Sequence, residues 1–546
     1  MFCVPKYIFV TGGVISSVGK GTIAASLGKV LSVRGVKVDF LKIDPYVNVD
    51  AGTMNPYVHG EVYVTADGGE TDLDLGWYER FTGITMSKLN NLTTGQVFSS
   101  VIEKERRGEY LGQCVQIIPH VTDEIKSRIR RVAERRGADV VIVEIGGTIG
   151  DIEGLPFYEA ARQMRLEEET LFVHVALVIY HEPTREMKTK AFQHSLQELR
   201  RIGIQPDVIV ARSPKMINEE VRRKLALFGT LPKEAVFCSY NVSPVYRLPL
   251  VLEEQGLGDY IAKKLGLPNN PDWSSWRRVV ELYDRATDVV KIALCGKYTA
   301  MEDSYVSIRE AIGHAAAHLG VRAELVMVEA EELEKDPTAL DSLRDFDGIL
   351  VAPGFGKRGT EGKIAAISFA RRTGTPFMGI CFGMQLAVVE FARNVLGLKD
   401  ANSTELDPGT PHPVIDLLPE QRVISAMGGT MRLGEHEVVI REGTLAYRIY
   451  GSTSIRRRHR HRYEVNPDYW DQLREGGLVF SGFSADGRRV EVIELPGHPF
   501  FVASQFHPEF SSTVESPEPL FMAFVDAARR HRAERSAAVT SQALSG

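Results

Sequence analysis

Two things are scarce in this sequence of 546 residues, namely cysteine and long apolar runs. The five cysteines stand at positions 3, 114, 238, 295 and 381, and no two of them form a CxxC pair. This spacing argues against a zinc ribbon or a disulfide framework and favours a reducing compartment. The most apolar segment, LFVHVALVIY at 171–180, is far shorter than the ~20 residues that a membrane helix needs. The first residues also lack the layout of a signal peptide, so we expect a cytoplasmic protein without a membrane segment.

A strong charge of either sign is absent as well. The formal net charge of −6 provides no general attraction to nucleic acid or to anionic membranes, so we expect neither as a partner. Any basic site must therefore be local. Apolar residues make up 44% of the chain and charged residues 25%, which is typical of a folded globular protein. At ~150 residues per domain, the length predicts about two to four domains.

What the chain does contain is two stretches of alternating strand and helix patterns. Short segments rich in Val and Ile recur in the first stretch: KYIFVT, VKVDFLKID, ADVVIVEI, FVHVALVIY and DVIVAR. A second stretch begins with VVKIALCGKY and continues with AELVMV and DGILVAP. Such alternation predicts an α/β fold with two doubly wound domains, the first with a parallel sheet. The glycine-rich loop at 12–22 makes this first domain one of the P-loop type. We expect domains at 1–266 and 289–530, a linker rich in Pro, Asn and Ser at 267–288, and a disordered tail at 531–546.

A glycine-rich loop, GGVISSVGKGT at 12–22, follows the first predicted strand and precedes a helix pattern. It departs from the strict phosphate-loop motif, because Val14 stands where the first glycine belongs and Gly21 stands where a hydroxyl belongs. The physical requirements remain. Glycines let backbone N–H groups approach phosphate, the helix start is electropositive, and Lys20 supplies a charge. The alternative is a glycine-rich turn that binds nothing.

Acidic and basic residues stand where strands of the first stretch end. Glu144 closes VVIVE as the acid of a Walker-B-type element does, and Asp74 lies in ETDLDLG, so both are candidate magnesium ligands. Asp151 and Glu153 follow on a loop at the edge where open α/β sheets bind ligands. Lys42 ends the second strand near Lys20, and two lysines at one site suit a heavily negative transition state. Each acid taken alone could equally be a solvated loop charge.

A further polar segment, EMKTKAFQHS, carries Lys188, Lys190 and Gln193. Such basic and amide donors suit a second phosphate-bearing molecule, although a solvated helix start has the same composition.

The second stretch carries a lone cysteine at a strand-to-helix corner. Gly379 and Gly383 flank Cys381 in G-x-C-x-G, the thiol analogue of the nucleophile elbow G-x-S-x-G. Near the end, ASQFHPEF places His507 and Glu509 two residues apart, so both side chains would lie on the same side of an extended segment. These residues form a possible triad of nucleophile, base and orienting carboxylate. The loop VAPGFGKRG offers backbone N–H groups for an oxyanion hole, with Gly354 the best candidate, and a buried structural cysteine is the alternative.

These motifs resemble known families. GICFGMQ with QFHPEF resembles the class I glutamine amidotransferase domain, and FVTGGVISSVGKG, LKIDPYVNVDAGTMNP and EIGGTIGDIEG resemble the synthetase domain of the CTP synthase family, over about residues 6–525. The resemblance implies an ATP-dependent, glutamine-hydrolysing ligase that aminates UTP to CTP, the final step of de novo CTP synthesis. ATP phosphorylates O4 of UTP, and ammonia from glutamine displaces the phosphate. It also implies Mg²⁺, GTP as activator, CTP as feedback inhibitor, and a homotetramer compatible with filament formation.

The resemblance assigns roles to individual residues. The residues implied to bind ATP are Ser17, Val18, Gly19, Lys20, Gly21, Thr22, Asp74, Tyr240, Asn241 and Val242. Those implied to bind UTP and CTP are Ser16, Asp151, Ile152, Glu153, Lys188, Thr189, Lys190, Ala191, Phe192, Gln193 and Lys224. Those implied to bind glutamine are Gly354, Phe382, Gly383, Met384, Gln385, Glu405 and Arg462. Asp74 and Glu144 would hold magnesium, and the catalytic residues would be Cys381, His507, Glu509, Lys20 and Lys42.

Two departures from the family pattern stand out. Ala191 and Phe192 replace a Pro-Thr pair, which we expect to change the loop and the strength of CTP inhibition. Ala352 and Pro353 precede Gly354 where the family often has Pro-Gly-Gly, and since proline lacks an N–H, the oxyanion donors must come from Gly354 and its neighbours.

Two other functions fit parts of the sequence. Cobyrinic acid amide synthetases pair similar domains but amidate carboxylates, and the segments LKIDPYVNVDAGTMNP and KTK argue against them. A nucleotide-switched scaffold or filament-forming ATPase with an inactive glutaminase domain is disfavoured by the intact Cys381, His507 and Glu509.

Overall fold

The computed structural model describes residues 4–54, 59–297, 301–418 and 431–545, so Cys3 lies outside the described residues. The chain forms two compact units, one of Met1–Thr53 with Glu70–Val280 and one of Met54–Gly69 with Glu281–Gly546. The division after Val280 falls inside helix α11 (Ser274–Arg285), within the segment expected to be a linker. The short segment before Glu70 packs with the second unit, although its place in the sequence had put it in the first domain.

The first unit is built on a parallel sheet with strand order β11-β10-β7-β1-β6-β2-β5. The strands are β1 (Lys6–Gly13), β2 (Val38–Asp44), β5 (Asn91–Thr93), β6 (Val140–Ile145), β7 (Thr170–Leu177), β10 (Val208–Ser213) and β11 (Val236–Tyr240). The predicted strands of this stretch are all present. The two edge strands, β5 and β11, were not predicted because one is very short and the other contains Cys and Ser among its apolar residues.

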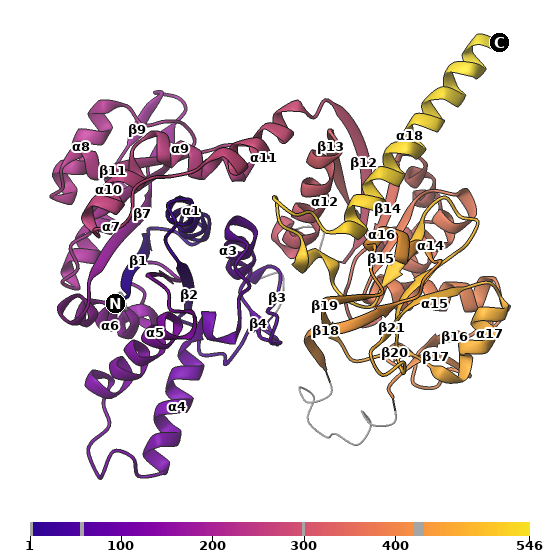
Figure 1. Cartoon of the computed structure of the whole chain (residues 1–546), viewed down its shortest axis with the longest axis horizontal. Helices are drawn as coiled ribbons and strands as arrows, with labels where there is room; N and C mark the ends of the chain where they lie inside the picture. Colours follow the sequence, from indigo (N-terminus) through magenta and orange to yellow (C-terminus); the bar gives the residue numbers. More distant parts are fainter. Residues whose placement is uncertain (1–3, 55–58, 298–300, 419–430, 546) are drawn as a thin grey trace. The chain divides into compact units, whose positions relative to one another are not determined.

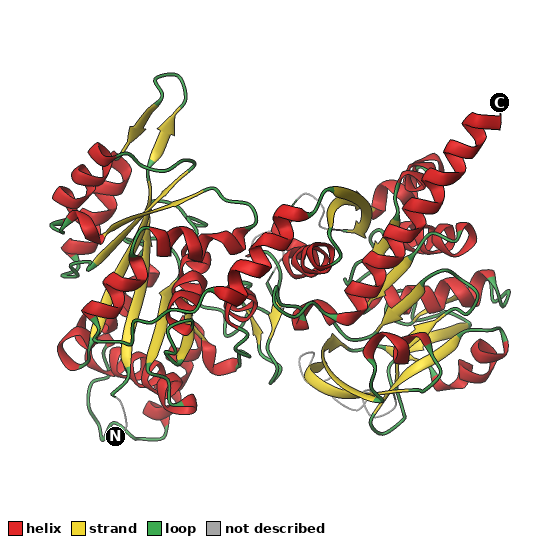
Figure 2. Cartoon of the chain, turned by 45° about the horizontal axis from the view of Figure 1, so that its top comes forward, coloured by secondary structure: helices red, strands yellow, loops and turns green. Residues whose placement is uncertain are grey.

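Helices cover both faces of this sheet (Figures 1 and 2). One face carries α4 (Thr94–Arg106), α5 (Thr122–Arg136), α6 (Leu155–Glu167), α7 (Lys190–Arg201) and α8 (Glu219–Gly229). The other carries α1 (Lys20–Ser32), α3 (Asp74–Thr82), α9 (Leu248–Glu254) and α10 (Leu257–Lys264). Burial on both faces explains why the strands read as continuous apolar runs: Tyr7 and Phe9 face one set of helices, and the buried Ile8 and Val10 alternate with them.

The second unit contains a larger, mixed sheet with strand order β13-β12-β14-β15-β23-β22-β21-β18-β19. Its parallel half consists of β12 (Asp288–Gly296), β13 (Val321–Glu329), β14 (Gly348–Val351), β15 (Phe377–Ile380) and β23 (Phe501–Ser504). Its antiparallel half consists of β18 (Arg432–Ile440), β19 (Ser454–His461), β21 (Val479–Ser484) and β22 (Val490–Glu494). Only the parallel half had been predicted, since the antiparallel strands alternate with many charged residues, as a half-exposed sheet does.

Two apolar clusters fill the two faces of this second sheet. The first packs under α14 (Thr360–Thr373) and α15 (Phe382–Asn394), together with the short helices α13 (Ala330–Lys335) and α17 (Trp470–Glu475). The second packs under α12 (Val306–His318), α16 (Leu445–Tyr450) and α18 (Pro519–Ser545). The α/β class with helices on both faces is thus found in both units.

The remaining strands form small sheets: β16 (Ala401–Ser403), β17 (His412–Asp416) and β20 (Glu464–Val465) in one, and the pairs β3 (Tyr63–Val64) with β4 (Glu70–Thr71) and β8 (Ile179–His181) with β9 (Glu186–Lys188). Helix α18 runs through most of the tail that we expected to be disordered, and its end is marked C in Figure 1. The tail contains four Ala and two Arg residues, which are strong helix formers. Across the residues placed here, no helix has the length and apolar character to cross a membrane.

Candidate active sites

The loop between β1 and α1 has the strained geometry of a phosphate-binding turn. Val14 and Ser17 adopt positive φ angles of 41° and 58°, and Gly19 has a φ of 94°. Among the residues that the structure describes, no side chain caps α1, so the first N–H groups of this helix stay available to an anion. Lys20 begins the helix, is buried, and donates a hydrogen bond to the Gly147 carbonyl over 2.6 Å. Burial lowers the pKa of Lys20.

A cluster of carboxylates surrounds Lys42 at the carboxyl end of β2. Its ammonium lies 3.1 Å from Glu144 Oε1, 3.6 Å from Asp72 and 3.9 Å from Asp44, and it also bonds Asp74. Lys42 and Glu144 are brought together by register, since they are paired on the adjacent strands β2 and β6. Burial raises the pKa of Glu144 to about 7, helped by Asp74, and raises that of Asp44 to about 8, helped by Asp72. The site therefore holds more buried acid than its lysine neutralises.

This cluster explains one departure from the strict phosphate-loop motif. A Cβ atom added to Gly21 would overlap the carboxylate of Asp74. The position that usually carries a magnesium-binding hydroxyl must be glycine here, because an acid from α3 occupies the space beside it. Thr22 does not substitute, since its hydroxyl donates to the Gly19 carbonyl over 3.0 Å.

Most of the residues implied for UTP and CTP come from three segments at the carboxyl edge of the first sheet, whereas Lys224 lies in the middle of α8. The loop after β6 is tied to the phosphate loop by the Ile149 N–H, which donates to the Gly12 carbonyl over 2.8 Å. Helix α7 approaches so closely that a Cβ on Gly13 would overlap Ser195. The Asp151 carboxylate accepts the Thr148 N–H over 2.7 Å and shapes this loop.

The predicted UTP and CTP residues differ in exposure. Those exposed to solvent are Ser16, Ile152, Glu153, Lys188, Lys190 and Lys224. Gln193 is buried and donates to the Thr189 hydroxyl over 2.9 Å. Phe192 is completely buried in an apolar cluster and packs edge-on against His174. The replacement noted at this position therefore adds a core side chain rather than a group that faces solvent.

Tyr240 ends β11, and Asn241 and Val242 follow it. A residue that sequence reasoning missed connects this segment to the phosphate loop. Arg212 on β10 donates to the Asn241 side chain over 2.6 Å and lies 3.8 Å from where a Cβ of Gly19 would stand. The only signal in the sequence was an arginine at the end of the predicted strand DVIVAR.

In the second unit, Cys381 stands on a strained corner between β15 and α15. Its φ of 52° and ψ of −102° are rare for a residue with a side chain. Both neighbouring glycines are required. A Cβ on Gly379 would lie 2.9 Å from Ala503 Cβ, and one on Gly383 would overlap the Val351 carbonyl. The predicted nucleophile elbow is present.

His507 and Glu509 complete a chain of contacts behind the thiol. Nδ1 of His507 lies 2.7 Å from Glu509 Oε1, and the ring lies close enough to Cys381 to interact with the thiol. The pKa of His507 is raised to about 10, because Glu509 and the nearby Cys381 outweigh the opposing effect of burial. The ring is also stacked on Phe510, with centroids 5.3 Å apart. The expected pairing is found, but the expected extended segment is wrong: Glu509 lies in a 3₁₀ turn (Pro508–Ser511), and this turn brings the two side chains together.

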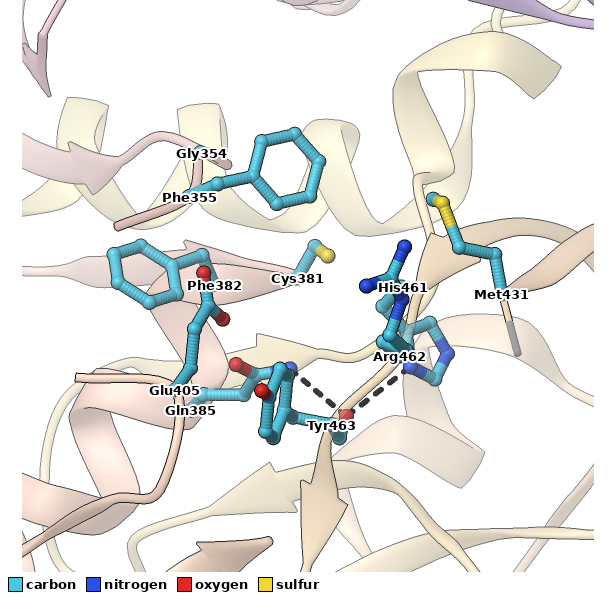
Figure 3. Close-up of a pocket in the computed structure, with 10 residues that line it drawn as sticks. All are labelled: Gly354, Phe355, Cys381, Phe382, Gln385, Glu405, Met431, His461, Arg462 and Tyr463. Atoms are coloured by element: carbon cyan, nitrogen blue, oxygen red, sulfur yellow. Dashed lines mark hydrogen bonds between the residues drawn. The ribbon is translucent and has the colours of Figure 1, made fainter. Parts of the chain in front are cut away.

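A cavity of about 230 Å³ opens in front of the thiol (Figure 3). It is lined by Gly354, Phe355, Cys381, Phe382, Gln385, Glu405, Met431, His461, Arg462 and Tyr463. Of the predicted glutamine-binding residues, Gly383 and Met384 do not line it, since α15 turns them toward the core. Glu405 lies on one side and Arg462 on the other, as a zwitterionic amino acid requires.

Four lining residues were not predicted: Phe355, Met431, His461 and Tyr463. The carbonyl of Tyr463 accepts hydrogen bonds from Gln385 at 3.0 Å and from the ring nitrogen of His461 at 3.2 Å. His461 and Tyr463 are the immediate neighbours of Arg462 in RHRHRYEVN, but the sequence predicted only Arg462 as a glutamine-binding residue.

Comparison with known proteins covers both halves of the chain. Residues 6–267 match the family model described as "CTP synthase N-terminus", and residues 300–527 match "Glutamine amidotransferase class-I". The "CTP synthase" of Sulfurisphaera tokodaii is 59% identical over 527 residues, covering 96% of this chain and 99% of the relative. That of Aeropyrum pernix is 59% identical over 534 residues, with the same coverage.

The chain belongs to the CTP synthase family. A solved structure described as "Trypanosoma brucei CTPS - glutaminase domain with bound acivicin" is 40% identical, covers 44% of this chain and 94% of that chain, and has a TM-score of 0.42. The members of the CTP synthase family aminate UTP to CTP with ATP and with nitrogen from glutamine.

Proposed function

We propose that the two sites of this chain divide the reaction of the CTP synthase family between them. The chain is a glutamine-hydrolysing CTP synthase. At the phosphate loop, ATP transfers its terminal phosphoryl group to O4 of UTP. At Cys381, glutamine is hydrolysed to glutamate and ammonia, and the ammonia displaces the phosphate at C4 to yield CTP. The observation that carries this proposal is a buried Cys–His–Glu set in a chain whose other half places two lysines at a phosphate loop.

The chemistry proposed for the second unit begins with the Cys381 thiolate. The sulfur attacks the amide carbon of glutamine, and the carbonyl oxygen becomes an oxyanion. This oxyanion accepts hydrogen bonds from the backbone N–H groups of Gly354 and Phe382. The imidazolium of His507 gives its proton to the leaving ammonia, and Glu509 holds the ring in place. His507 then removes a proton from water, which hydrolyses the thioester to glutamate and frees the thiol.

The chemistry proposed for the first unit is mainly neutralisation of charge. The N–H groups of residues 17–22 cradle the phosphates of ATP, and Lys20 and Lys42 stabilise the phosphoryl group during transfer. Supporting this, both ammonium groups are buried at the carboxyl edge of the sheet, where a charge is felt most strongly.

Magnesium fits this site through Asp74 and Glu144. Within the described ranges, no three His, Cys, Asp or Glu side chains are arranged to hold a metal ion. Mg²⁺ needs only one or two carboxylates when phosphate oxygens and waters supply the rest. The excess of buried acid around Lys42 favours a further cation. When bound, it would neutralise the phosphates of ATP.

The remaining proposals concern ligands and assembly. UTP and its product CTP would bind at the segments around Ser16, Asp151 and Lys188, with CTP as feedback inhibitor and GTP as activator. These rest on the family. A homotetramer, compatible with filaments, is supported by apolar side chains exposed on and after α4: Ile102, Leu111, Ile117 and Ile118. The domain limits 1–266 and 289–530 and a cytoplasmic location also stay proposals, the latter supported by the free thiols at Cys114, Cys238, Cys295 and Cys381.

The test supplies UTP, ATP, Mg²⁺ and either glutamine or ammonia to the full chain. We expect CTP from both nitrogen sources. Cys381→Ala should abolish glutamine-dependent synthesis and leave ammonia-dependent synthesis within about twofold, because the thiol acts only on glutamine. Loss of both activities would contradict the division of labour, and a parent chain that forms no CTP from either nitrogen source would refute the proposed function.

A further inference from the structure

Two lysines lie beneath the loop that carries Gly354, and the mechanism above does not use them. Lys297 follows the last residue of β12, and Lys363 lies in the first turns of α14. Their exposed fractions are 2% and 0%. Burial lowers the pKa of Lys297 to about 8 and that of Lys363 to about 7. Apolar side chains of similar size would fill this space at less cost, so the two charges need another explanation.

The ammonium groups of both lysines donate hydrogen bonds to backbone carbonyls of this loop. Lys297 donates to the carbonyl of Phe355 and, over 2.9 Å, to that of Gly356. Lys363 donates to Ala352 over 2.8 Å and contacts Pro353 over 3.4 Å. Two buried charges thus hold four carbonyls within a stretch of five residues.

Because the peptides are planar and trans, holding their carbonyls also fixes the direction of the N–H groups of the loop. In each peptide the C=O and the following N–H point in opposite directions. Lys297 holds the Phe355 carbonyl, and the next N–H, of Gly356, points instead to Glu405 over 2.9 Å. Glu405 lines the cavity, so the side opposite the lysines is the cavity side. The same rule directs the Gly354 N–H away from Lys363, toward the cavity that Cys381 also lines.

Both lysines also lie near Phe382, whose N–H is the second proposed donor to the oxyanion. A Cβ on Gly354 would lie 3.5 Å from Lys363 Nζ and 3.6 Å from Lys297 Cε. The ring of Phe382, the residue after Cys381, has the two ammonium groups 5.4 and 5.7 Å from its centroid. Gly354, Phe382 and the thiol surround one end of the cavity (Figure 3).

We propose that Lys297 and Lys363 are positioning residues of the glutaminase site, which anchor the carbonyls of residues 352–356 so that the Gly354 N–H meets the oxyanion. This inference rests on the glutaminase function proposed for Cys381. It assigns the greater part to Lys363, because Lys363 contacts the Pro353 carbonyl, which shares a peptide group with the Gly354 N–H, whereas Lys297 holds carbonyls that follow Gly354. It also explains how the loop works with Pro353, which has no N–H of its own.

The first test compares Lys297→Met and Lys363→Met in the full chain. Because a misplaced oxyanion donor weakens only the transition state, we expect kcat for glutamine hydrolysis to fall about 10- to 100-fold for Lys363→Met and about 3- to 10-fold for Lys297→Met. KM for glutamine should stay within about threefold. Ammonia-dependent CTP synthesis should be unchanged. Lys291→Met is the matched control, since Lys291 lies on the same strand with half of its side chain exposed.

The second test separates positioning from mere structural support. An aldehyde analogue of glutamine forms a tetrahedral adduct with the thiol, so its affinity depends on the oxyanion hole. Glutamate forms no such adduct, so its affinity does not depend on the oxyanion hole. We expect Lys363→Met to weaken the aldehyde by the same factor as kcat and to leave glutamate binding unchanged. An unchanged kcat, an aldehyde affinity that does not follow kcat, or an equal loss of ammonia-dependent synthesis would overturn the inference. If Lys363→Met does not fold, Lys297→Met decides by the same criteria. A parent chain that does not hydrolyse glutamine would instead refute the proposed function.

Discussion

At the scale of single residues, the glutaminase site depends on a backbone that few side chains tolerate. Cys381 has a positive φ and is held there by an N–H that donates to the Ser504 carbonyl over 2.7 Å. Strain of this kind costs about 1–3 kcal/mol and persists only where surrounding packing enforces it. Here Gly379 and Gly383 allow the close packing. The strain is thus maintained at the atom that reacts.

The His507–Glu509 pair gives a prediction that involves pH. Glu509→Gln should lower kcat for glutamine hydrolysis by about 10²- to 10⁴-fold, because the imidazolium loses its charged partner. The folded pKa of His507, about 10, lies above the unfolded value of ~6.5. Its contribution to stability is therefore fully present below pH ~6.5 and is lost as pH rises through about 10.

Calorimetry between pH 6 and 10 checks the second part of this prediction. The melting temperature of the parent chain should fall across this range more steeply than that of Glu509→Gln, which has less of this contribution to lose. Parallel curves would contradict the assigned pKa, and ammonia-dependent CTP synthesis serves as the control for folding.

At the scale of elements, the phosphate loop shows how one helix alters the motif of another. Helix α3 brings Asp74 to the first turn of α1, so Gly21 replaces the usual hydroxyl residue. Strand register likewise pairs Lys42 with Glu144. The chemistry of the site is therefore shared among α1, α3, β2 and β6, and no single loop contains it.

Restoring the strict motif should therefore damage the enzyme. We expect Gly21→Ser to lower ammonia-dependent CTP synthesis by about 10²-fold or more, because the added side chain displaces a carboxylate that neutralises Lys42. Hydrolysis of glutamine without nucleotides should be unchanged. Measuring both rates checks the prediction, and a gain in synthesis would show that the hydroxyl takes over the role of Asp74.

At the scale of the whole molecule, each unit has a core of its own. Separate apolar clusters lie in the first unit and in the second. Every residue of the triad belongs to the second unit, and both phosphate-loop lysines belong to the first. Substitutions that disable one chemistry should then spare the other.

Lys20→Met tests this independence of the two chemistries in the first unit, as Cys381→Ala tests it in the second. Since Lys20 neutralises the phosphoryl group, its loss should reduce CTP synthesis about 10³-fold with either nitrogen source. Glutamine hydrolysis without nucleotides should persist within about twofold. Glutamate and CTP are measured in the same samples. Equal loss of both products would mean that Lys20 supports the fold of the whole chain.

The features that the sequence by itself determined are those whose parts are neighbours along the chain. Lys20 in its glycine loop, Cys381 between two glycines, and His507 two residues before Glu509 could be found because local backbone geometry brings these groups together. The buried parallel strands were equally clear, since burial on both faces leaves an unbroken apolar run. Even there, the local form could be misjudged, as the 3₁₀ turn at Glu509 shows.

Tertiary structure alone decided which distant residues complete each site. Arg212 beside Gly19, the acids around Lys42, and Lys297 and Lys363 under Gly354 come from separate strands and helices, so no spacing in the sequence connects them. It also placed Phe192 in the core and the tail in α18. The physical reason is that a side chain's partner across a sheet or beneath a loop is set by register and packing, which depend on the whole fold.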